Sequence, residues 1–349
     1  MIDQTSTTNT DAESALGGVS RRAFLAFTAL AAGAATLPAW ARAARQPAEM
    51  ILEWEEFAPG VFAQVNTNTG GNVLVAAGRG RTLVIDSKYP YIAEAIRRDA
   101  LGMGEPDADV MLVNTHHHGD HTGGNPAFVG RAETMAHENA LPRIEAQYET
   151  YMTWVPTAVR QARQSVPGND KVRELAEEFL QTADGLTAKS WLPERGVGRE
   201  DRLNLGGMAA ELRHFGAGHT DNDLVVRIPE LNVVHTGDLV FNSFVPFFDA
   251  DAGVTAFGWI ASLREIEKLC DDETIVVPGH GRVGDKQVVV SQIAFLEKLV
   301  EAVQAEIDAG VPKDQARIKQ FEFMNGLGFK NLGARAIDAV YDELVNSAG

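Results

Sequence analysis

A dense cluster of histidine and aspartate follows directly after a short apolar run of the chain. The run Val110 to Val113 is typical of a buried strand, and it leads into the cluster at residues 116–121. In extended backbone, residues two apart point the same way. His116 and His118 can therefore face one metal ion, while His117 points away. This cluster constrains the fold, because metal ligands must be held in fixed positions.

Two further members of the cluster extend the candidate metal site. Asp120 and His121 begin the next turn of the chain and can face a second ion. Imidazole and carboxylate are the ligands that borderline divalent metals such as zinc prefer. A structural ion takes about four ligands, and a catalytic ion takes about three plus water. The cluster alone cannot complete two sites, so distant residues have to contribute.

Three distant residues are candidates to complete the two sites. Each comes directly after a glycine, with an apolar strand-like run upstream or nearby. Loops of this kind gather at one edge of a sheet, so we expect the three side chains to meet the cluster. They are His219 in Gly-His-Thr, Asp238 in His-Thr-Gly-Asp, and His280 in Pro-Gly-His-Gly.

Strand-like and helix-like runs alternate along the rest of the chain, separated by glycine and proline turns. The predicted strands are Met50 to Trp54, Val61 to Val65, Asn72 to Ala76, Thr82 to Ile85, Val110 to Val113, Glu211 to His214, Leu224 to Ile228, Val233 to Thr236 and Thr274 to Val277. The predicted helices are Tyr91 to Leu101, Val254 to Leu269, Lys286 to Asp308 and Leu332 to Val345. Strands followed by helices twice over predict two α/β halves around one core.

A stretch of different composition, about 141–187, lies between the cluster at residues 116–121 and His219. It is rich in Glu, Gln, Ala and Arg, with Leu175 and Phe179 at helical spacing, and Pro156 and Pro167 break it into pieces. We predict a helical insertion within a main domain that spans residues 50–349. Its position suggests a part in shaping the pocket.

Composition narrows the class of protein and its partners. The net charge of -17 repels nucleic acid and anionic membranes, so we expect neither as a partner and instead expect a small-molecule substrate. Cys270 is the single cysteine, which excludes a disulfide within the monomer and a thiolate-rich metal site. The sequence does not indicate an oligomeric state.

The N-terminal residues 1–43 have the pattern of an export signal. Arg21 and Arg22 stand directly before an apolar run, Ala23 to Leu37, and Ala41-Arg42-Ala43 has the small-x-small pattern of a cleavage site. The run is shorter than the roughly 20 residues that a membrane span needs. Paired arginines in this context resemble a twin-arginine translocation signal, which predicts a periplasmic protein without stable membrane insertion.

The metal motifs, taken together, resemble those of the metallo-β-lactamase superfamily. His-x-His-x-Asp-His, Gly-His-Thr, Gly-Asp and Pro-Gly-His-Gly occur in the family's order, between Asp86 and Gly281. The resemblance implies an α/β fold, the four-layer αββα sandwich, and a metal-dependent hydrolase. It also implies that Asp86 supports the metal loop.

Carried over by position, the resemblance implies a dinuclear centre with two zinc ions, although iron or manganese would also suit these ligands. The first ion would take His116, His118 and His219, the second would take Asp120, His121 and His280, and Asp238 would bridge the two. A bridging hydroxide would attack an amide- or ester-type bond. Asp120 would be the catalytic residue that orients this hydroxide or moves a proton.

Two positions bear on the substrate. Asp238 stands where the main lactamase subclass carries cysteine, and Phe241 stands where those enzymes carry a lysine that holds the drug's carboxylate. Lactonases of the family place tyrosine at Phe241, and glyoxalase II has glutamate where this chain has Gly281. We therefore expect an exported hydrolase of a β-lactam, lactone or thioester, with weak or promiscuous lactam activity. The alternatives are a phosphodiesterase on the same site and a diiron redox protein of the same fold, although no flavin-binding segment is evident.

Other residues near these motifs have structural roles in our interpretation. His117, His214 and His235 are expected to pack or to support ligands. His137 is expected at the surface or along the cleft. The two tryptophans of the insertion region, Trp154 and Trp191, are expected to pack rather than to cover the cleft.

Overall fold

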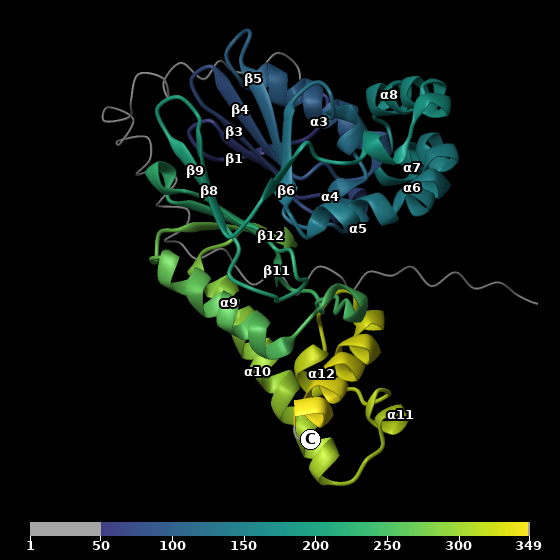
Figure 1. The fold of residues 1–349 in the computed structure, drawn as a ribbon, viewed down its shortest axis with the longest axis vertical. Coiled ribbons are helices and arrows are strands. Elements are labelled where there is room, and N and C mark those ends of the chain that lie inside the picture. The colour runs from purple at the N-terminus through teal and green to yellow at the C-terminus, as the bar shows by residue number, and fades with distance from the viewer. Residues whose placement is uncertain (1–49, 348–349) are drawn as a thin grey trace, which may run out of the picture. The chain divides into compact units, whose positions relative to one another are not determined.

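The structure, a computed structural model, describes residues 50–347, so the predicted export signal at residues 1–43 lies outside the described part. Two sheets lie face to face, and helices cover the outer face of each (Figure 1). None of the helices described between residues 50 and 347 is long and apolar enough to cross a membrane.

The first sheet has seven strands in sequence order. They are β1 (Glu55–Ala58), β2 (Val61–Gln64), β3 (Val73–Ala77), β4 (Arg81–Ile85), β5 (Asp109–Val113), β6 (Glu133–His137) and β7 (Arg195–Val197). Strands β1 to β4 pair antiparallel, whereas β4 to β7 pair parallel. The carboxyl ends of β4, β5 and β6 therefore meet at one edge of the sheet.

The second sheet has five strands in the order β12-β11-β10-β9-β8. They are β8 (Glu200–Asn204), β9 (Ala209–Arg213), β10 (Val225–Ile228), β11 (Val233–Phe241) and β12 (Ile275–His280). Strands β11 and β12 pair parallel, and the others pair antiparallel. Residues that end β11 and β12 consequently lie side by side.

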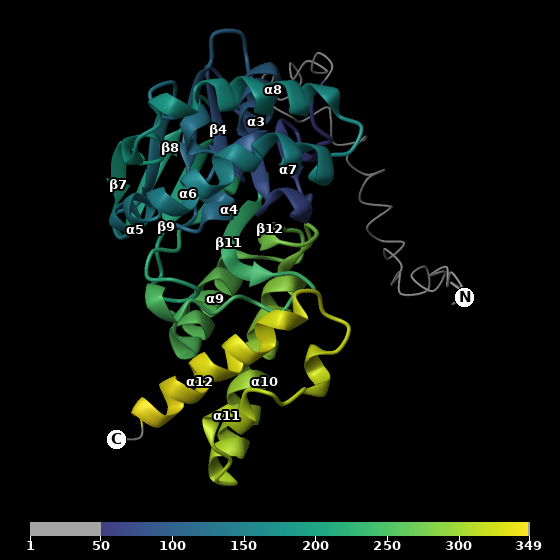
Figure 2. The same cartoon turned by 90° about the vertical axis from the view of Figure 1, so that its right-hand side faces the viewer.

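Helices form the two outer layers. They are α3 (Pro90–Met103), α4 (Gly119–Thr122), α5 (Ala140–Ala146), α6 (Tyr148–Trp154), α7 (Ala158–Ser165), α8 (Asp170–Gln181), α9 (Ala256–Leu269), α10 (Lys286–Asp308), α11 (Lys313–Ala316) and α12 (Gly333–Ser347). Helices α3, α7 and α8 share a core with the first sheet, and α9, α10 and α12 share one with the second. Figure 2 shows α9, α10 and α12 gathered on the side of β11 and β12. The predicted four-layer αββα sandwich is confirmed.

Alternation along the strands explains how the first sheet buries both faces. Val73, Val75 and Val84 contribute to the core shared with the helices, whereas Leu74 and Leu83, at the alternate positions, are equally buried. Successive side chains of a strand point to opposite faces. The second set therefore faces the other sheet.

The predicted strand from Met50 to Trp54 is wrong, because the first strand begins at Glu55. The backbone N–H groups of Ile51 and Leu52 donate to the carboxylate of Asp99, at 2.8 and 2.9 Å, and the Trp54 indole Nε1 donates to it at 2.9 Å. These donors pair with a side chain of α3 instead of a neighbouring strand.

Besides β1, three strands escaped the sequence analysis. Strand β6 is short, β7 has three residues, and β8 is largely polar, with the sequence Glu-Asp-Arg-Leu-Asn at a sheet edge. None shows a strong apolar run. Strand β11 is also longer than predicted: past Thr236 its pairing with β12 shifts register at Gly237 and continues to Phe241.

The stretch at 141–187 contains most of α5 and the helices α6, α7 and α8. Pro156 falls in a short 3-10 turn between α6 and α7, and Pro167 falls in the break before α8. That this stretch is an insertion that shapes the pocket stays a prediction.

Asp99 anchors the segment before β1, so its removal should loosen that segment. Asp99→Ala leaves three donors without their acceptor, and we expect a loss of about 2 kcal/mol of unfolding free energy. Urea unfolding measures the loss, and amide exchange at Ile51 and Leu52 should accelerate. The control Asp109→Ala removes an exposed carboxylate. Equal stability of the two variants would show that Asp99 is no anchor.

Candidate metal centre

All seven predicted ligand residues lie close together where the two sheets meet. In a first group the ligand atoms of His116, His118, His219 and Asp238 lie within 4.8 Å of one another, and in a second group so do those of Asp120, His121 and His280. The first loop follows β5 and runs into α4. His219 lies between β9 and β10, Asp238 lies in β11, and His280 ends β12.

The first group centres on one imidazole nitrogen. His118 Nδ1 lies 3.0 Å from Nε2 of His116 and 3.0 Å from Nε2 of His219. The Oδ2 atom of Asp238 lies 3.5 Å from His219 Nε2 and 3.7 Å from His116 Nε2. His116, His219 and Asp238 are buried, and His118 is partly exposed. Three nitrogens and one carboxylate oxygen therefore converge on one point.

Hydrogen bonds on the far side of the rings fix which nitrogens face this point. The hydroxyl of Thr115 donates to Asp86 Oδ2 at 2.8 Å, so Thr115 Oγ1 accepts from His116 Nδ1 at 3.0 Å. His118 Nε2 donates to Asp249 Oδ2 at 2.8 Å. The inward nitrogens of His116 and His118 then carry lone pairs. Lone pairs that converge in this way repel one another unless a cation lies between them.

The second group approaches Asp238 from another side. His121 Nε2 lies 3.1 Å from Asp238 Oδ1 and 3.7 Å from Asp120 Oδ2. His280 Nε2 lies 3.2 Å from Asp120 Oδ2 and 3.5 Å from Asp238 Oδ2. Asp238 therefore lies between the two groups: its Oδ1 faces His121, whereas its Oδ2 lies 3.5 to 3.7 Å from the imidazoles of His116, His219 and His280.

A buried carboxylate holds the first loop in shape. Asp86 accepts from the backbone N–H of Thr115 at 2.8 Å, from its hydroxyl, and from His121 Nδ1 at 2.7 Å. The bond from His121 leaves its Nε2 free to face Asp238. Asp86 is fully buried and has a φ of 66°, a left-handed conformation that side-chain bonding stabilises. These contacts support the expectation that Asp86 orders the metal loop.

Asn72, which sequence analysis treated only as the start of a strand, ties the His280 loop to the first sheet. Its Nδ2 donates to the carbonyls of Pro278 and Gly281, both at 2.8 Å, and its backbone N–H donates to Gly279 at 2.7 Å. Those acceptors lie more than two hundred residues away. No local sequence pattern predicts a hydrogen-bond partner so far along the chain. Asp249, which accepts from His118, could not be predicted for the same reason.

Two glycines are required by close approach to the ligands. A Cβ on Gly71 would lie 2.1 Å from Cε1 of His121, and a Cβ on Gly279 would lie 1.9 Å from Oδ1 of Asp238. Any side chain at these positions would displace a ring or a carboxylate of the centre. Gly279, the residue before His280, therefore leaves space for the carboxylate of Asp238 in the neighbouring strand.

Burial keeps part of the first group neutral. It lowers the pKa of His116 well below its usual range and the pKa of His219 to about 3, because burial disfavours the charged imidazolium. In both cases the carboxylate of Asp238 opposes the shift without cancelling it. Neutral imidazole is the form that binds a metal ion.

The second group has the opposite balance. Burial disfavours a charge on His121 and His280, but the carboxylates of Asp238 and Asp120 outweigh it. The pKa of His121 is raised well above its usual range and that of His280 to about 9. Burial would raise the pKa of Asp238, yet the imidazoles around it hold that pKa well below the usual value. The protons on His121 and His280 thus offset the negative charge of the Asp120 and Asp238 carboxylates. A bound divalent cation would offset that charge in their place.

The donor set fits divalent metal ions. Among the described residues, His121 Nε2 and Asp238 Oδ1 are buried and lie 3.1 Å apart, yet neither makes a hydrogen bond of good geometry. A buried polar atom without a partner is costly. A cation between them would satisfy both atoms. Nitrogen and carboxylate ligands without thiolate suit zinc, and also iron or manganese.

The remaining histidines lie outside the two groups. His117 belongs to neither group, although its ring lies 4.5 Å from that of His118 and its Nε2 lies 3.7 Å from Asp249 Oδ2; the Asn222 side chain accepts from its backbone N–H at 3.0 Å. His235 is buried in β11, where its Nδ1 accepts from Gly237. The expected surface position of His137 is wrong: its ring is buried and lies 4.1 Å from that of His214.

The two tryptophans pack against the loop that carries the cluster. Trp191 is buried, and its Nε1 donates to the carbonyl of Gly123 at 2.9 Å. Trp154, in α6, is partly exposed and covers Gly119, where a Cβ would lie 2.3 Å from its ring. Trp154 thus borders the backbone next to Asp120.

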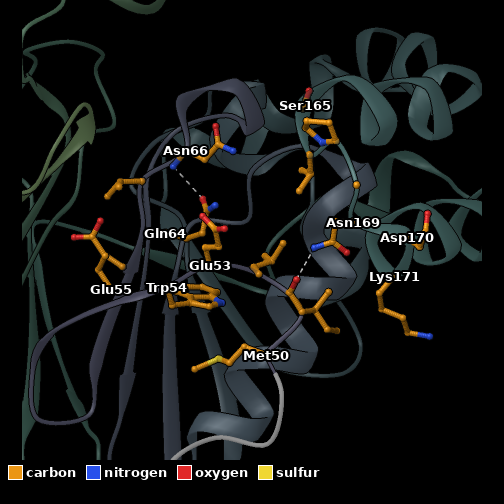
Figure 3. Close-up of a pocket in the computed structure, with 17 residues that line it drawn as sticks. Met50, Glu53, Trp54, Glu55, Gln64, Asn66, Ser165, Asn169, Asp170 and Lys171 are labelled. Atoms are coloured by element: carbon orange, nitrogen blue, oxygen red, sulfur yellow. Dashed lines mark hydrogen bonds between the residues drawn. The ribbon is translucent and has the colours of Figure 1, made fainter. Parts of the chain in front are cut away.

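A separate cavity of about 1230 Å³ lies along the segment before β1. Residues 50–55, 63–66 and 165–171 line it, as Figure 3 shows. None of the seven candidate ligands contributes to this lining. The cavity is therefore distinct from the metal centre.

Comparison with known proteins points to one family. The sequence profile of the metallo-beta-lactamase superfamily matches residues 66–280. The chain is 30% identical over 95 residues to a metallo-beta-lactamase type 2 of Bacillus cereus, which covers 27% of this chain and 37% of that protein. It is 26% identical over 113 residues to a metallo-beta-lactamase type 2 of Bacteroides fragilis, and this match covers 32% of this chain and 45% of that protein. The chain thus spans less than half the length of these curated relatives.

Solved structures show the same fold. TMB-1 superposes with a TM-score of 0.50 at 22% identity, over 71% of this chain and 97% of that chain. A metallo-beta-lactamase from Pontibacter korlensis superposes with a TM-score of 0.50 at 17% identity, over 70% of this chain and 99% of that chain. These likenesses support the fold alone.

The hydrogen bond from His118 to Asp249 generates a prediction about metal affinity. Asp249→Ala leaves the His118 ring without its orienting partner, and we expect about 10- to 100-fold weaker binding of one ion. Competition with a chromogenic chelator measures it. The control Asp251→Ala removes an exposed carboxylate two residues away. Affinities within twofold of each other for the two variants would contradict the role of Asp249.

Proposed function

The chain belongs to the metallo-β-lactamase superfamily, and on that basis we propose that it is an exported dinuclear zinc hydrolase that cleaves an amide- or ester-type bond. The observation that carries the proposal is the position of Asp238 between two groups of imidazoles. A carboxylate that lies in contact with both groups of imidazoles is suited to bridge two cations.

In the proposed centre, three histidines hold one ion and Asp120, His121 and His280 hold the other. Ions bound there would supply Lewis acidity, which lowers the pKa of a water molecule and polarises the scissile carbonyl. Asp120 has the most exposed side chain of the seven candidates, with 24% of its surface accessible. From this position its carboxylate would orient a water molecule and carry a proton.

Phe241 bears on the substrate. Its ring is buried and stacks on His280, with centroids 5.1 Å apart and planes 16° apart. An apolar ring there cannot form a charge-assisted bond to a substrate carboxylate. We therefore favour lactones and thioesters over β-lactams, for which we expect weak activity.

Two alternatives share the site: a phosphodiesterase and a diiron redox protein. A panel of nitrocefin, an acyl-homoserine lactone, a glutathione thioester and bis-nitrophenyl phosphate separates the first from our proposal. Metal analysis of the purified protein separates the second. Turnover of a lactone or thioester with two zinc ions bound is the result we expect.

The proposed export depends on Arg21 and Arg22. Replacing both with lysine should keep the protein in the cytoplasm, because the twin-arginine pathway recognises the arginine pair. Fractionation of cells that express each form measures the distribution, and N-terminal sequencing of the mature protein should show cleavage after Ala43. Unchanged export of the double variant would contradict this route.

The ligand assignment predicts the loss of metal from single variants. His118→Ala and Asp120→Ala each remove one ligand, so each should lose at least one metal equivalent and most activity, whereas His214→Asn, outside both groups, should keep both ions. Mass spectrometry of the metal content and turnover on the best substrate of the panel check this. If the first two variants retain two metals and full turnover, the assignment is wrong.

A further inference from the structure

A third group of converging ligand atoms lies beside the two groups of the proposed centre. Among the residues that the structure describes, His117, His118 and Asp249 are the one further set whose ligand atoms all lie within 4.8 Å of one another. Asp249 Oδ2 lies 2.8 Å from His118 Nε2 and 3.7 Å from His117 Nε2. Two imidazole nitrogens therefore face one carboxylate oxygen.

The two nitrogens of the His118 ring face different groups. Its Nδ1 lies 3.0 Å from Nε2 of His116 and 3.0 Å from Nε2 of His219, whereas its Nε2 faces Asp249. The two ring nitrogens of histidine are distinct, and each is a metal ligand when it carries no proton. The His118 ring can therefore join the third group to the first through its second nitrogen.

His117 is held in place by residues from two other segments. Its Nδ1 lies 3.1 Å from Nδ2 of Asn222, between β9 and β10, and Oδ1 of Asn222 accepts from its backbone N–H at 3.0 Å. The side chain of Gln147, between α5 and α6, donates to the carbonyl of His117 at 2.9 Å. These contacts fix a buried histidine that neither ion of the proposed centre uses.

Solvent reaches this third group. The side chains of His118 and Asp249 keep 15% and 14% of their surface accessible, and that of His117 keeps 7%. Arg143, whose charge also acts on His117, forms an ion pair with Asp221 at 2.6 Å, so its positive charge is largely offset. An ion with some of its water ligands can therefore approach the three ligand atoms.

We propose that His117, His118 and Asp249 form a third metal site, which binds Zn²⁺ or a similar divalent ion when the metal is in excess over the two central ions. Imidazole and carboxylate suit zinc, and three protein ligands plus water are a common zinc coordination. The ion bonds to His118 Nε2 in place of the proton that this nitrogen donates to Asp249, and the proton passes to solvent.

The third site is weaker than the central ones and acts on them. Two cations that share one imidazole ring repel each other, and the third ion has only one carboxylate to offset its charge. Its binding also ends the hydrogen bond by which Asp249 orients the His118 ring. Excess zinc therefore weakens the hold on the first ion and lowers turnover. The effect on turnover rests on the proposed function, whereas the site itself does not.

Equilibrium dialysis against rising free zinc, followed by mass spectrometry of the metal content, tests the site without turnover. The unaltered protein should bind two equivalents tightly and a third at higher zinc. His117→Asn removes one ligand of the third site, so it should keep the two tight ions and bind the third at least about tenfold more weakly. His214→Asn, which alters a histidine outside all three groups, should bind the third ion as the unaltered protein does.

A second variant separates coordination by Asp249 from its orienting role. Asp249→Asn removes the negative charge but keeps an oxygen that can accept from His118 Nε2, so it should lose the third equivalent. The control Asp251→Asn, which removes an exposed carboxylate two residues away, should keep it. Absence of a third equivalent, or a third equivalent that His117→Asn binds as tightly as the unaltered protein, would overturn the site.

The effect on the central ions is measured in two ways. Excess zinc should speed the exchange of isotope-labelled zinc from the first site and lower turnover of the best substrate, and His117→Asn should need at least about tenfold more zinc for either effect. Exchange and turnover that respond equally to zinc in both proteins would contradict the coupling. Absence of turnover on every substrate, with a His117-dependent third equivalent and exchange, would count only against the proposed function.

Discussion

The position of one carboxylate, that of Asp238, determines how the centre is arranged. Its Oδ1 lies 3.1 Å from His121, and its Oδ2 lies 3.5 Å from both His219 and His280, so the carboxylate contacts both groups of imidazoles. Such a carboxylate is stable in a buried site only when positive charge surrounds it. Protonated His121 and His280 can supply that charge, and so can divalent cations. The rest of the fold holds this arrangement in place.

The two sheets bring the ligands together from opposite directions. The loop after β5 belongs to the first sheet, whereas Asp238 and His280 come from β11 and β12 of the second. Asp86 orders the first loop, and Asn72 joins the first sheet to the loop around His280. Because the ligands come from both sheets, the centre depends on the docking of both halves and cannot form within either one.

The candidate ligands could be predicted from sequence because each lies in a short motif with glycine next to a strand. Apolar runs likewise predicted most strands and the long helices, including α10 at its observed bounds. Polar edge strands such as β8 could not be predicted in this way, because their pairing depends on the neighbouring strand and not on an apolar pattern of their own. Asn72 and Asp249 were missed for a related reason: their roles come from contacts with residues far away along the chain.

The most direct test of the account is anomalous diffraction at the zinc edge from crystals of the zinc-loaded protein. The account predicts two peaks per chain, one beside His116, His118 and His219 and one beside Asp120, His121 and His280, with a carboxylate oxygen of Asp238 in contact with each. A single peak, or two ions without Asp238 between them, would contradict the bridging role on which the proposed chemistry depends.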